Sequence, residues 1–270
     1  MAKIAVVRRI PEQSKERRGI TELSENEHAY GQCAKCASPK RQCGPVGDFI
    51  PEGICSTEIY PEIIEKAMAH YKEPGVAEFA LQSTRQSDAA HGKLQGNDVR
   101  FPCKCRIQET VEFARRMRYK KLGLAFCGAV HPEAIKLAKI LEVQGFEVVS
   151  VCCKVGKKNK ECVGVSQAEQ DAVGIHTYMC NPIVQAEILN HEKTDMNILL
   201  GLCVGHDALF LKYSEAFCTV LAVKDRLLCN NPMGALYLAD WHYKRLYNPE
   251  AFDRFDENGN KIEPASAQQP

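Results

Sequence analysis

The fold is decided by the stretch Lys121-Leu-Gly-Leu-Ala-Phe-Cys127, a short and almost continuous apolar run. A helical pattern follows from Pro132 to about Gln144, with Gly145 in position to end the helix. A second apolar run comes next, Phe146-Glu-Val-Val-Ser-Val-Cys152. This order predicts a strand, a helix and a second strand of one parallel sheet.

The same alternation returns further along the chain. A strand is predicted over 196–203, a helix from about His206, a strand over 217–223, and a last helix from Pro232 to Leu246. Apolar strands that alternate with helices indicate a sheet buried on both faces and built with right-handed crossovers. The sequence therefore predicts an α/β fold: a Rossmann-like parallel sheet of about four strands with helices on both faces, preceded by a cysteine-rich, mainly helical N-terminal region.

Composition divides the chain into four predicted segments. They are a flexible arm over 1–28, a cysteine-rich helical metal-binding region over 29–118, a Rossmann-like α/β domain over 119–248, and a disordered tail over 249–270. Within the second segment, helices are expected from near Pro61, through Val76 and after Cys105.

The charge balance, the apolar runs and the length of the chain exclude several classes of protein. The chain has 35 Lys and Arg against 34 Asp and Glu, so it lacks the basic excess of a nucleic-acid-binding protein. No apolar run approaches the roughly 20 residues that span a bilayer, and the N-terminal residues do not resemble a signal peptide. At 270 residues the chain can bury a core without disulfides. We therefore expect a soluble cytoplasmic protein with reduced thiols and no membrane or nucleic-acid partner.

Fourteen cysteines are the strongest chemical signal in the sequence. Four of them lie in a segment rich in Pro and Gly that has no other means of folding: Cys33, Cys36, Cys43 and Cys55. The first two are spaced so that neighbouring thiolates can bind one metal. Zinc suits a closed four-cysteine site, whereas an iron–sulfur cluster tolerates the irregular spacing of the second pair better.

More cysteines fall where strands of the predicted sheet end. Cys127, Cys152 or Cys153, and Cys203 occupy these ends, and Cys180 and Cys229 directly precede helices. Because the carboxyl ends of parallel strands meet at one edge, we expect these thiols to converge there. Taken singly, each cysteine is more often a small buried hydrophobe than a ligand, and Cys218, inside a strand, is assigned to the core.

Two further cysteines complete the set of expected ligands. Cys103 and Cys105 stand just ahead of a helix and either add to the strand-end centre or complete the N-terminal one. The predicted metal ligands are Cys33, Cys36, Cys43, Cys55, Cys103, Cys105, Cys127, Cys153, Cys180 and Cys203.

Four polar residues are predicted to lie at the same edge. His206 and Asp207 follow Cys203 and are candidate catalytic groups, although helix capping by Asp207 with an exposed His206 is an equal alternative. Lys224 and Arg226 follow the last strand and would bind a small anionic substrate or form a surface turn.

Several of these runs together resemble a known family. They are Lys121 to Cys127, Gly145 to Lys154, Met179 to Ala186, Gly201 to Asp207 and Leu221 to Arg226. The set is similar to the cysteine-rich, predicted metal-binding family of unknown function found mainly in anaerobic bacteria and archaea. One departure is Cys229-Asn-Asn-Pro232, where that family tends to have Gly-His-Asn-Pro.

The resemblance implies a metal-binding protein, and an iron–sulfur protein of an anaerobe in particular. We therefore expect one or two iron–sulfur clusters, of the 4Fe–4S type, that act in electron transfer or reductive chemistry with a redox partner protein or a small anionic substrate. The alternative is a zinc-binding or metal-handling protein without redox activity. A third hypothesis, thiol or persulfide transfer by Cys152 and Cys153 without metal, leaves the N-terminal cysteines unexplained.

Overall fold

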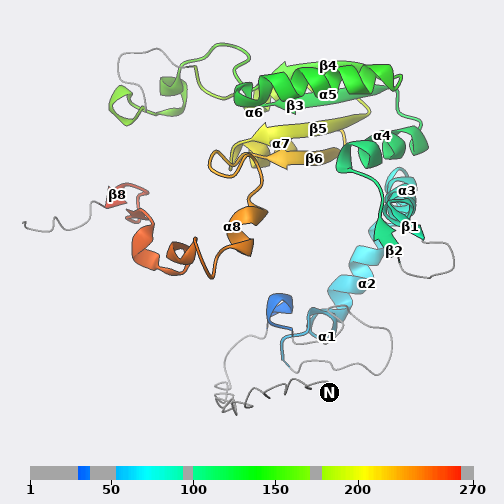
Figure 1. Ribbon diagram of the computed structural model, residues 1–270, viewed down its shortest axis with the longest axis horizontal. Coiled ribbons are helices and arrows are strands. Elements are labelled where there is room, and N and C mark those ends of the chain that lie inside the picture. Colours follow the sequence, from blue (N-terminus) through cyan, green and yellow to red (C-terminus); the bar gives the residue numbers. More distant parts are fainter. Residues whose placement is uncertain (1–29, 37–52, 94–99, 171–177, 263–270) are drawn as a thin grey trace, which may run out of the picture. The chain divides into compact units, whose positions relative to one another are not determined.

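A computed structural model describes residues 30–36, 53–93, 100–170 and 178–262 (Figure 1). The chain forms two compact units, 1–73 and 74–270. The predicted flexible arm and Cys43 lie outside the described residues. The domain boundary that the sequence suggests after residue 118 stays a prediction.

The described residues of the first unit form two short helices and one turn of 3-10 helix: η1 (Cys33–Lys35), α1 (Ser56–Ile59) and α2 (Pro61–His70). Proline at the first position of α2 presets its backbone for a helix, as the sequence predicts. The two described stretches lie side by side, because Gln32 N–H donates to Ile54 O over 3.0 Å and Gly31 N–H donates to the Tyr60 hydroxyl over 3.1 Å.

The described residues of the second unit form the sheet, its helices and two small hairpins. Its helices are α3 (Val76–Ala89), α4 (Arg106–Arg116), α5 (His131–Val143), α6 (Pro182–His191), α7 (His206–Tyr213) and α8 (Met233–Tyr237). Its strands are β1 (His91–Lys93), β2 (Arg100–Pro102), β3 (Lys121–Phe126), β4 (Glu147–Cys152), β5 (Met196–Leu202), β6 (Cys218–Val223), β7 (Arg254–Phe255) and β8 (Lys261–Ile262). Turns of 3-10 helix add η2 (Gly128–Val130), η3 (Lys160–Val163), η4 (Gln167–Glu169), η5 (Lys244–Tyr247) and η6 (Pro249–Ala251). None of the helices in the described part of the chain is long and apolar enough to cross a membrane.

Strands β4, β3, β5 and β6 form one sheet in that order, and every neighbouring pair is parallel (Figure 1). Helix α5 packs against β3 and β4, while α6 contacts the same strands and α7. The predicted α/β fold, with a four-stranded parallel sheet flanked by helices, is confirmed. The strand order reverses direction between β3 and β5, which is the switch point where ligands commonly bind in such sheets.

The two central strands form the core of the sheet. Every residue of β5 is buried, and all of β3 except Lys121 is buried as well. Their sequences are almost continuous apolar runs because helices cover both faces of the sheet. Gln185 of α6, which is fully buried, donates its side-chain N–H groups to Phe126 O at 3.2 Å and Val151 O at 2.7 Å. This amide therefore ties the carboxyl ends of β3 and β4 together.

Gly201 near the end of β5 has a left-handed backbone, with φ of 65°. The pairing of β5 with β6 shifts register on both sides of Leu200, so the backbone departs from a regular strand here. A Cβ atom at position 201 would lie 3.0 Å from the Val130 side chain. Glycine therefore lets the turn after β3 pack closely on the end of β5.

Three parts of the structure differ from the sequence-based prediction. The last helix, predicted from Pro232 to Leu246, is wrong beyond Tyr237, where α8 ends and turns follow. Its large apolar side chains are mostly exposed, so little packing stabilises a longer helix. The hairpin of β1 and β2 was not anticipated. Within the tail predicted to be disordered, residues up to 262 form η6 and the hairpin of β7 and β8, and 263–270 lie outside the described residues.

A polar network joins α3 to α4. The Glu112 carboxylate accepts hydrogen bonds from Lys104 Nζ at 2.6 Å, Gln86 Nε2 at 2.9 Å and Gln108 Nε2 at 3.0 Å. Gln86 in turn accepts one from Arg116 Nε at 2.9 Å. These donors, Lys104 first, lower the pKa of Glu112 to about 2. The carboxylate is thus held ionised at the junction of the two helices.

We expect Glu112→Gln to lower the free energy of unfolding at neutral pH by about 1 to 2 kcal/mol, because it removes a charge-assisted hydrogen bond. The pKa is lower in the folded chain, so this stabilisation is complete above the unfolded value and disappears as pH falls toward about 2. Urea unfolding from neutral to acidic pH measures it. The exposed Glu142→Gln is the control, and a difference between wild type and Glu112→Gln that stays constant with pH would contradict the assignment.

We expect Gly201→Ala to destabilise the fold more than Gly205→Ala. Both glycines have positive φ, so both variants lose about 1 kcal/mol from backbone strain. Only position 201 also has a side chain within 4 Å of the new methyl group, which should add about 1 kcal/mol or more. Equal losses in denaturant unfolding would show that the contact with Val130 is unimportant.

Candidate functional site

Cysteines follow three neighbouring strands at the carboxyl edge of the sheet. Cys127 comes directly after β3, Cys152 ends β4 and Cys153 follows it, and Cys203 follows β5. Phe126, which precedes Cys127, is paired with Cys152 on one side and Leu200 on the other. Neighbouring parallel strands lie about 4.8 Å apart, so the structure brings these residues to one edge. We call the set of Cys127, Cys152, Cys153, Cys180 and Cys203 the thiol rim.

Cys180 reaches this edge from a different part of the chain. It precedes α6, whose start is set by Pro182 and by Asn181, the side chain of which accepts a hydrogen bond from Val184 N–H at 3.3 Å. Asn181 N–H donates to Cys153 O at 2.7 Å, which fixes the segment beside the end of β4. The Sγ atoms of Cys153 and Cys180 lie 3.7 Å apart. Two thiols from different parts of the chain are therefore in contact.

The pKa values of these two thiols are shifted in opposite directions. The hydrogen bond with Cys153 lowers the pKa of Cys180, and nearby Lys154 and His206 act in the same direction. The hydrogen bond with Cys180 and burial raise the pKa of Cys153. Cys153 is only 3 % exposed, whereas Cys180 is half-buried. The pair therefore loses its first proton easily and holds its second tightly.

The turn after β3 places the N–H group of Gly128 beside the same pair of thiols. Gly128 N–H points at Cys153 Sγ, 3.4 Å away, and stabilises negative charge on that sulfur. Cys152 Sγ lies 3.5 Å from the place where Gly128 would carry a Cβ. Buried Cys127 is close enough for its charge to raise the pKa of Cys153. Three cysteines thus surround one turn.

The predicted basic residues lie at the end of β5. Arg226 Nη2 donates to Cys203 Sγ at 3.3 Å, and Lys224 Nζ lies 3.5 Å from the position of a Cβ on Gly201. Asp225 holds the turn between them by accepting hydrogen bonds from the N–H groups of Leu227 and Leu228 at 2.9 and 2.8 Å. The structure therefore adds positive charge beside the thiol of Cys203.

His206 and Asp207 begin α7, and their N–H groups both donate to Cys203 O. His206 lies near Cys180, because it contributes to lowering that pKa. The Asp207 carboxylate accepts a hydrogen bond from Ala208 N–H at 2.8 Å, within the first turn of its own helix. His206 is thus near enough to influence Cys180, whereas the Asp207 carboxylate contacts its own helix. A catalytic role for either residue stays a prediction.

Cys103 and Cys105 do not lie at the thiol rim. Cys105 precedes α4, and the next residue, Arg106, contacts Thr219 at the beginning of β6. That is the amino edge of the sheet, the opposite end of the strands. Cys103 Sγ donates to Ala90 O at 3.3 Å.

In the first unit, Cys33 and Cys55 come from the two stretches that lie side by side. Cys33 Sγ is 3.1 Å from Ser56 Oγ, and hydrogen bonds with the Ser56 side chain and backbone lower the pKa of Cys33. Cys36 N–H donates to Cys33 O at 3.1 Å. The structure thus brings part of the predicted N-terminal set together, and Cys43 cannot be placed because it lies outside the described residues.

Within residues 30–36, 53–93, 100–170 and 178–262, no group of three or more His, Cys, Asp or Glu side chains is arranged to hold a metal ion. The pair of Cys153 and Cys180 nevertheless has a spacing that suits metal binding. Two thiolates on one tetrahedral zinc, with Zn–S bonds of about 2.3 Å, lie about 3.8 Å apart. The donor chemistry therefore fits half of a tetrahedral site.

Two residues important to the rim were missed by sequence reasoning. They are Gln185 and Lys154. Gln185 carries an uncharged polar group on the buried face of α6, and its Oε1 has no hydrogen-bond partner among the described residues. A lone polar residue on an apolar helix face was the available signal for it. Lys154 was visible only as part of a basic loop, although its Nζ donates to Tyr178 O and holds the segment of Cys180.

Comparison with known proteins gives a family and a relative. A family model described as "Protein of unknown function (DUF1847)" matches residues 55–221. This match contains Cys127, Cys153, Cys180 and Cys203 and leaves out Cys33 and Cys36. An uncharacterized protein of Methanocaldococcus jannaschii is 49% identical over 146 residues, which make up 53% of this chain and 72% of that protein. No solved structure matches the chain.

In the reduced, metal-free protein we expect Cys180 to react with iodoacetamide already at about pH 6, because its thiolate is stabilised. Cys218 is the internal control, since burial raises its pKa and it should react only in alkaline solution. Peptide mapping by mass spectrometry after timed alkylation measures both rates. The prediction fails if Cys180 gains reactivity only near the ordinary thiol pKa of about 8.5.

Proposed function

Since this chain belongs to the family of proteins of unknown function DUF1847, whose description names no activity, we propose from the geometry of the thiol rim that it is a metal-binding protein. Cys153 and Cys180 bind one thiophilic metal ion together. The observation that carries the proposal is the 3.7 Å separation of their Sγ atoms at the carboxyl edge of the sheet.

Charge at the rim supports this assignment. Two thiolates bring two negative charges into a half-buried place, which is unfavourable unless they are compensated. Lys154 and His206 lie close enough to Cys180 to lower its pKa, and Gly128 N–H donates to Cys153. A bound cation would supply the remaining charge and remove the second proton, which the metal-free pair holds tightly.

Further ligands must complete the coordination. Cys127 is the nearest candidate, because it follows the strand beside β4 and interacts with Cys153. A change of its side-chain rotamer would add a third sulfur, and water or a substrate atom could take the fourth position. An open fourth position is the usual arrangement of a metal site that acts on a substrate.

The sulfur spacing also bears on the kind of centre. In a 4Fe–4S cluster each iron takes one cysteine, whereas a single ion or an iron of a 2Fe–2S cluster takes two. A pair of sulfurs only 3.7 Å apart suits two thiolates on one metal. The spacing therefore favours a single ion or a 2Fe–2S cluster at this pair over the 4Fe–4S cluster that the sequence suggests.

Iron here would support electron transfer or reductive chemistry with a redox partner protein, in keeping with the thiol-rich surroundings. Zinc would instead support metal handling without a redox step. Lys224 and Arg226 would attract a small anionic substrate to the same edge in either case.

We expect Cys180→Ser and Cys153→Ser each to lose the metal centre of this pair relative to wild type after anaerobic purification, because each removes one of the two thiolates. The double variant should lose no more than either single one, since both residues serve one centre. Elemental analysis for iron and zinc, a sulfide assay and the visible absorption spectrum measure metal content and type.

Cys162→Ser is the matched control, because this exposed thiol lies in η3 outside the rim and should leave the metal content unchanged. Folding of each variant is checked by circular dichroism. Folded variants of Cys153 and Cys180 that retain the wild-type metal content would overturn the proposal. A colourless protein with zinc would support metal binding and reject the electron-transfer role.

A further inference from the structure

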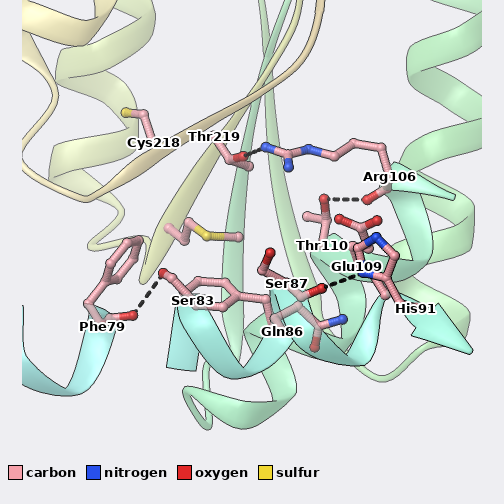
Figure 2. Close-up of a pocket in the computed structure, with 13 residues that line it drawn as sticks. Phe79, Ser83, Gln86, Ser87, His91, Arg106, Glu109, Thr110, Cys218 and Thr219 are labelled. Atoms are coloured by element: carbon pink, nitrogen blue, oxygen red, sulfur yellow. Dashed lines mark hydrogen bonds between the residues drawn. The ribbon is translucent and has the colours of Figure 1, made fainter. Parts of the chain in front are cut away.

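A pocket of about 450 Å³ lies at the amino edge of the sheet, at the opposite end of the strands from the thiol rim. Helices α3 and α4 form two of its walls, and the first residues of β5 and β6 form another (Figure 2). Its size falls within the roughly 300 to 1,000 Å³ of small-molecule sites in proteins. Neither the fold nor the thiol rim gives this pocket a role.

One side of the pocket is aromatic and rigid. Phe79 of α3 and Phe113 of α4 meet edge to face with their ring centroids 5.0 Å apart. Phe217 stacks on Phe79 at 4.1 Å and so fixes the ring from behind. Met196, only 1 % exposed, adds a polarisable side chain to the lining. A flat apolar molecule would find a surface here that is already ordered.

The other side is polar and carries three titratable groups: Arg106, Glu109 and His91. The Arg106 side chain reaches across the pocket from α4 to β6, where its Nη2 donates to Thr219 Oγ1 at 2.8 Å (Figure 2). Thr219 is the one recorded partner of this guanidinium among the described residues, so four of its five N–H donors remain for a ligand. The bond to Thr219 also restrains the side chain in place.

His91 and Glu109 lie on the same side of the view as the base of Arg106 (Figure 2). His91 Nδ1 is engaged with Ser87 O at 3.2 Å, which orients its ring. Glu109 is half-buried, and its carboxylate can accept a hydrogen bond from an N–H group of a ligand. It would repel a ligand that carries a second acidic group. The polar side thus combines one fixed cation with one acceptor.

We infer that this pocket binds a small aromatic carboxylate of one or two fused rings. Its carboxylate would accept paired hydrogen bonds from Arg106, since guanidinium and carboxylate match in geometry. Its ring would lie against Phe79, Phe113 and Met196, and a ring N–H would donate to Glu109. This inference does not rest on metal binding at the thiol rim, because no residue is shared between the two places.

Indole-2-carboxylate and indole-2-carboxamide are the probes, because they share shape and ring N–H and differ in the acidic group. We expect the carboxylate to bind at least about tenfold more tightly, as loss of a charge-assisted hydrogen bond implies. Titration of full-length protein labelled with ¹³C at methionine methyl groups measures binding. The chain has six methionines, so the shift of Met196 can be assigned by substitution.

Arg106→Gln should weaken carboxylate binding about tenfold and leave carboxamide binding unchanged, whereas Arg106→Lys, which keeps the charge, should retain part of the difference. Arg85→Gln on the exposed side of α3 is the matched control and should behave as wild type. Equal binding of the two probes, an unmoved Met196 signal, or equal weakening by Arg85→Gln would each overturn the inference.

Discussion

The pairing of β3 with its two neighbours at their carboxyl ends is the constraint on which the thiol rim depends. Phe126 O accepts hydrogen bonds from both Cys153 N–H and the Gln185 side chain, and Cys127 N–H donates to Leu200 O. These bonds fix where each strand stops. Because side chains alternate between the two faces of a strand, a slip of one residue in β4 would turn its side chains to the opposite face and separate the thiols. The hydrogen bonds of the sheet therefore position the sulfur atoms, and side-chain packing only refines them.

Much of this architecture could be predicted because strong periodicity and tertiary packing agree. The runs that became β3, β4, β5 and β6 are mostly apolar, and prolines mark the beginnings of α5 and α6 between them. The prediction that the last helix continues to Leu246 fails because the sequence pattern and the packing disagree there. Its apolar residues repeat as a helix would require, but Leu236 and Tyr237 remain exposed, so no packing extends the helix. The hairpins were missed because their strands are too short to show alternation.

The rim itself was only partly visible in the sequence. The rule that parallel strands end together was enough to gather Cys127, Cys153 and Cys203, and the prolines marked the helix that brings Cys180. The rule could not place Cys103 and Cys105, because α4 precedes the first strand of the sheet and its start is free to lie at either edge. It also could not find the aromatic pocket, whose lining comes from two helices and two strand starts far apart in the chain.

A parallel sheet has two chemically different ends, and this chain places the thiol rim at one and an aromatic cavity at the other. The seven residues of β5 separate them by roughly 20 Å. A molecule of one or two rings seated in the cavity is too short to touch the sulfur atoms of the thiol rim, so both ends cannot act on the same atom. Substitutions at the two ends share no neighbours, and their free-energy effects are therefore expected to be additive unless the strands themselves move.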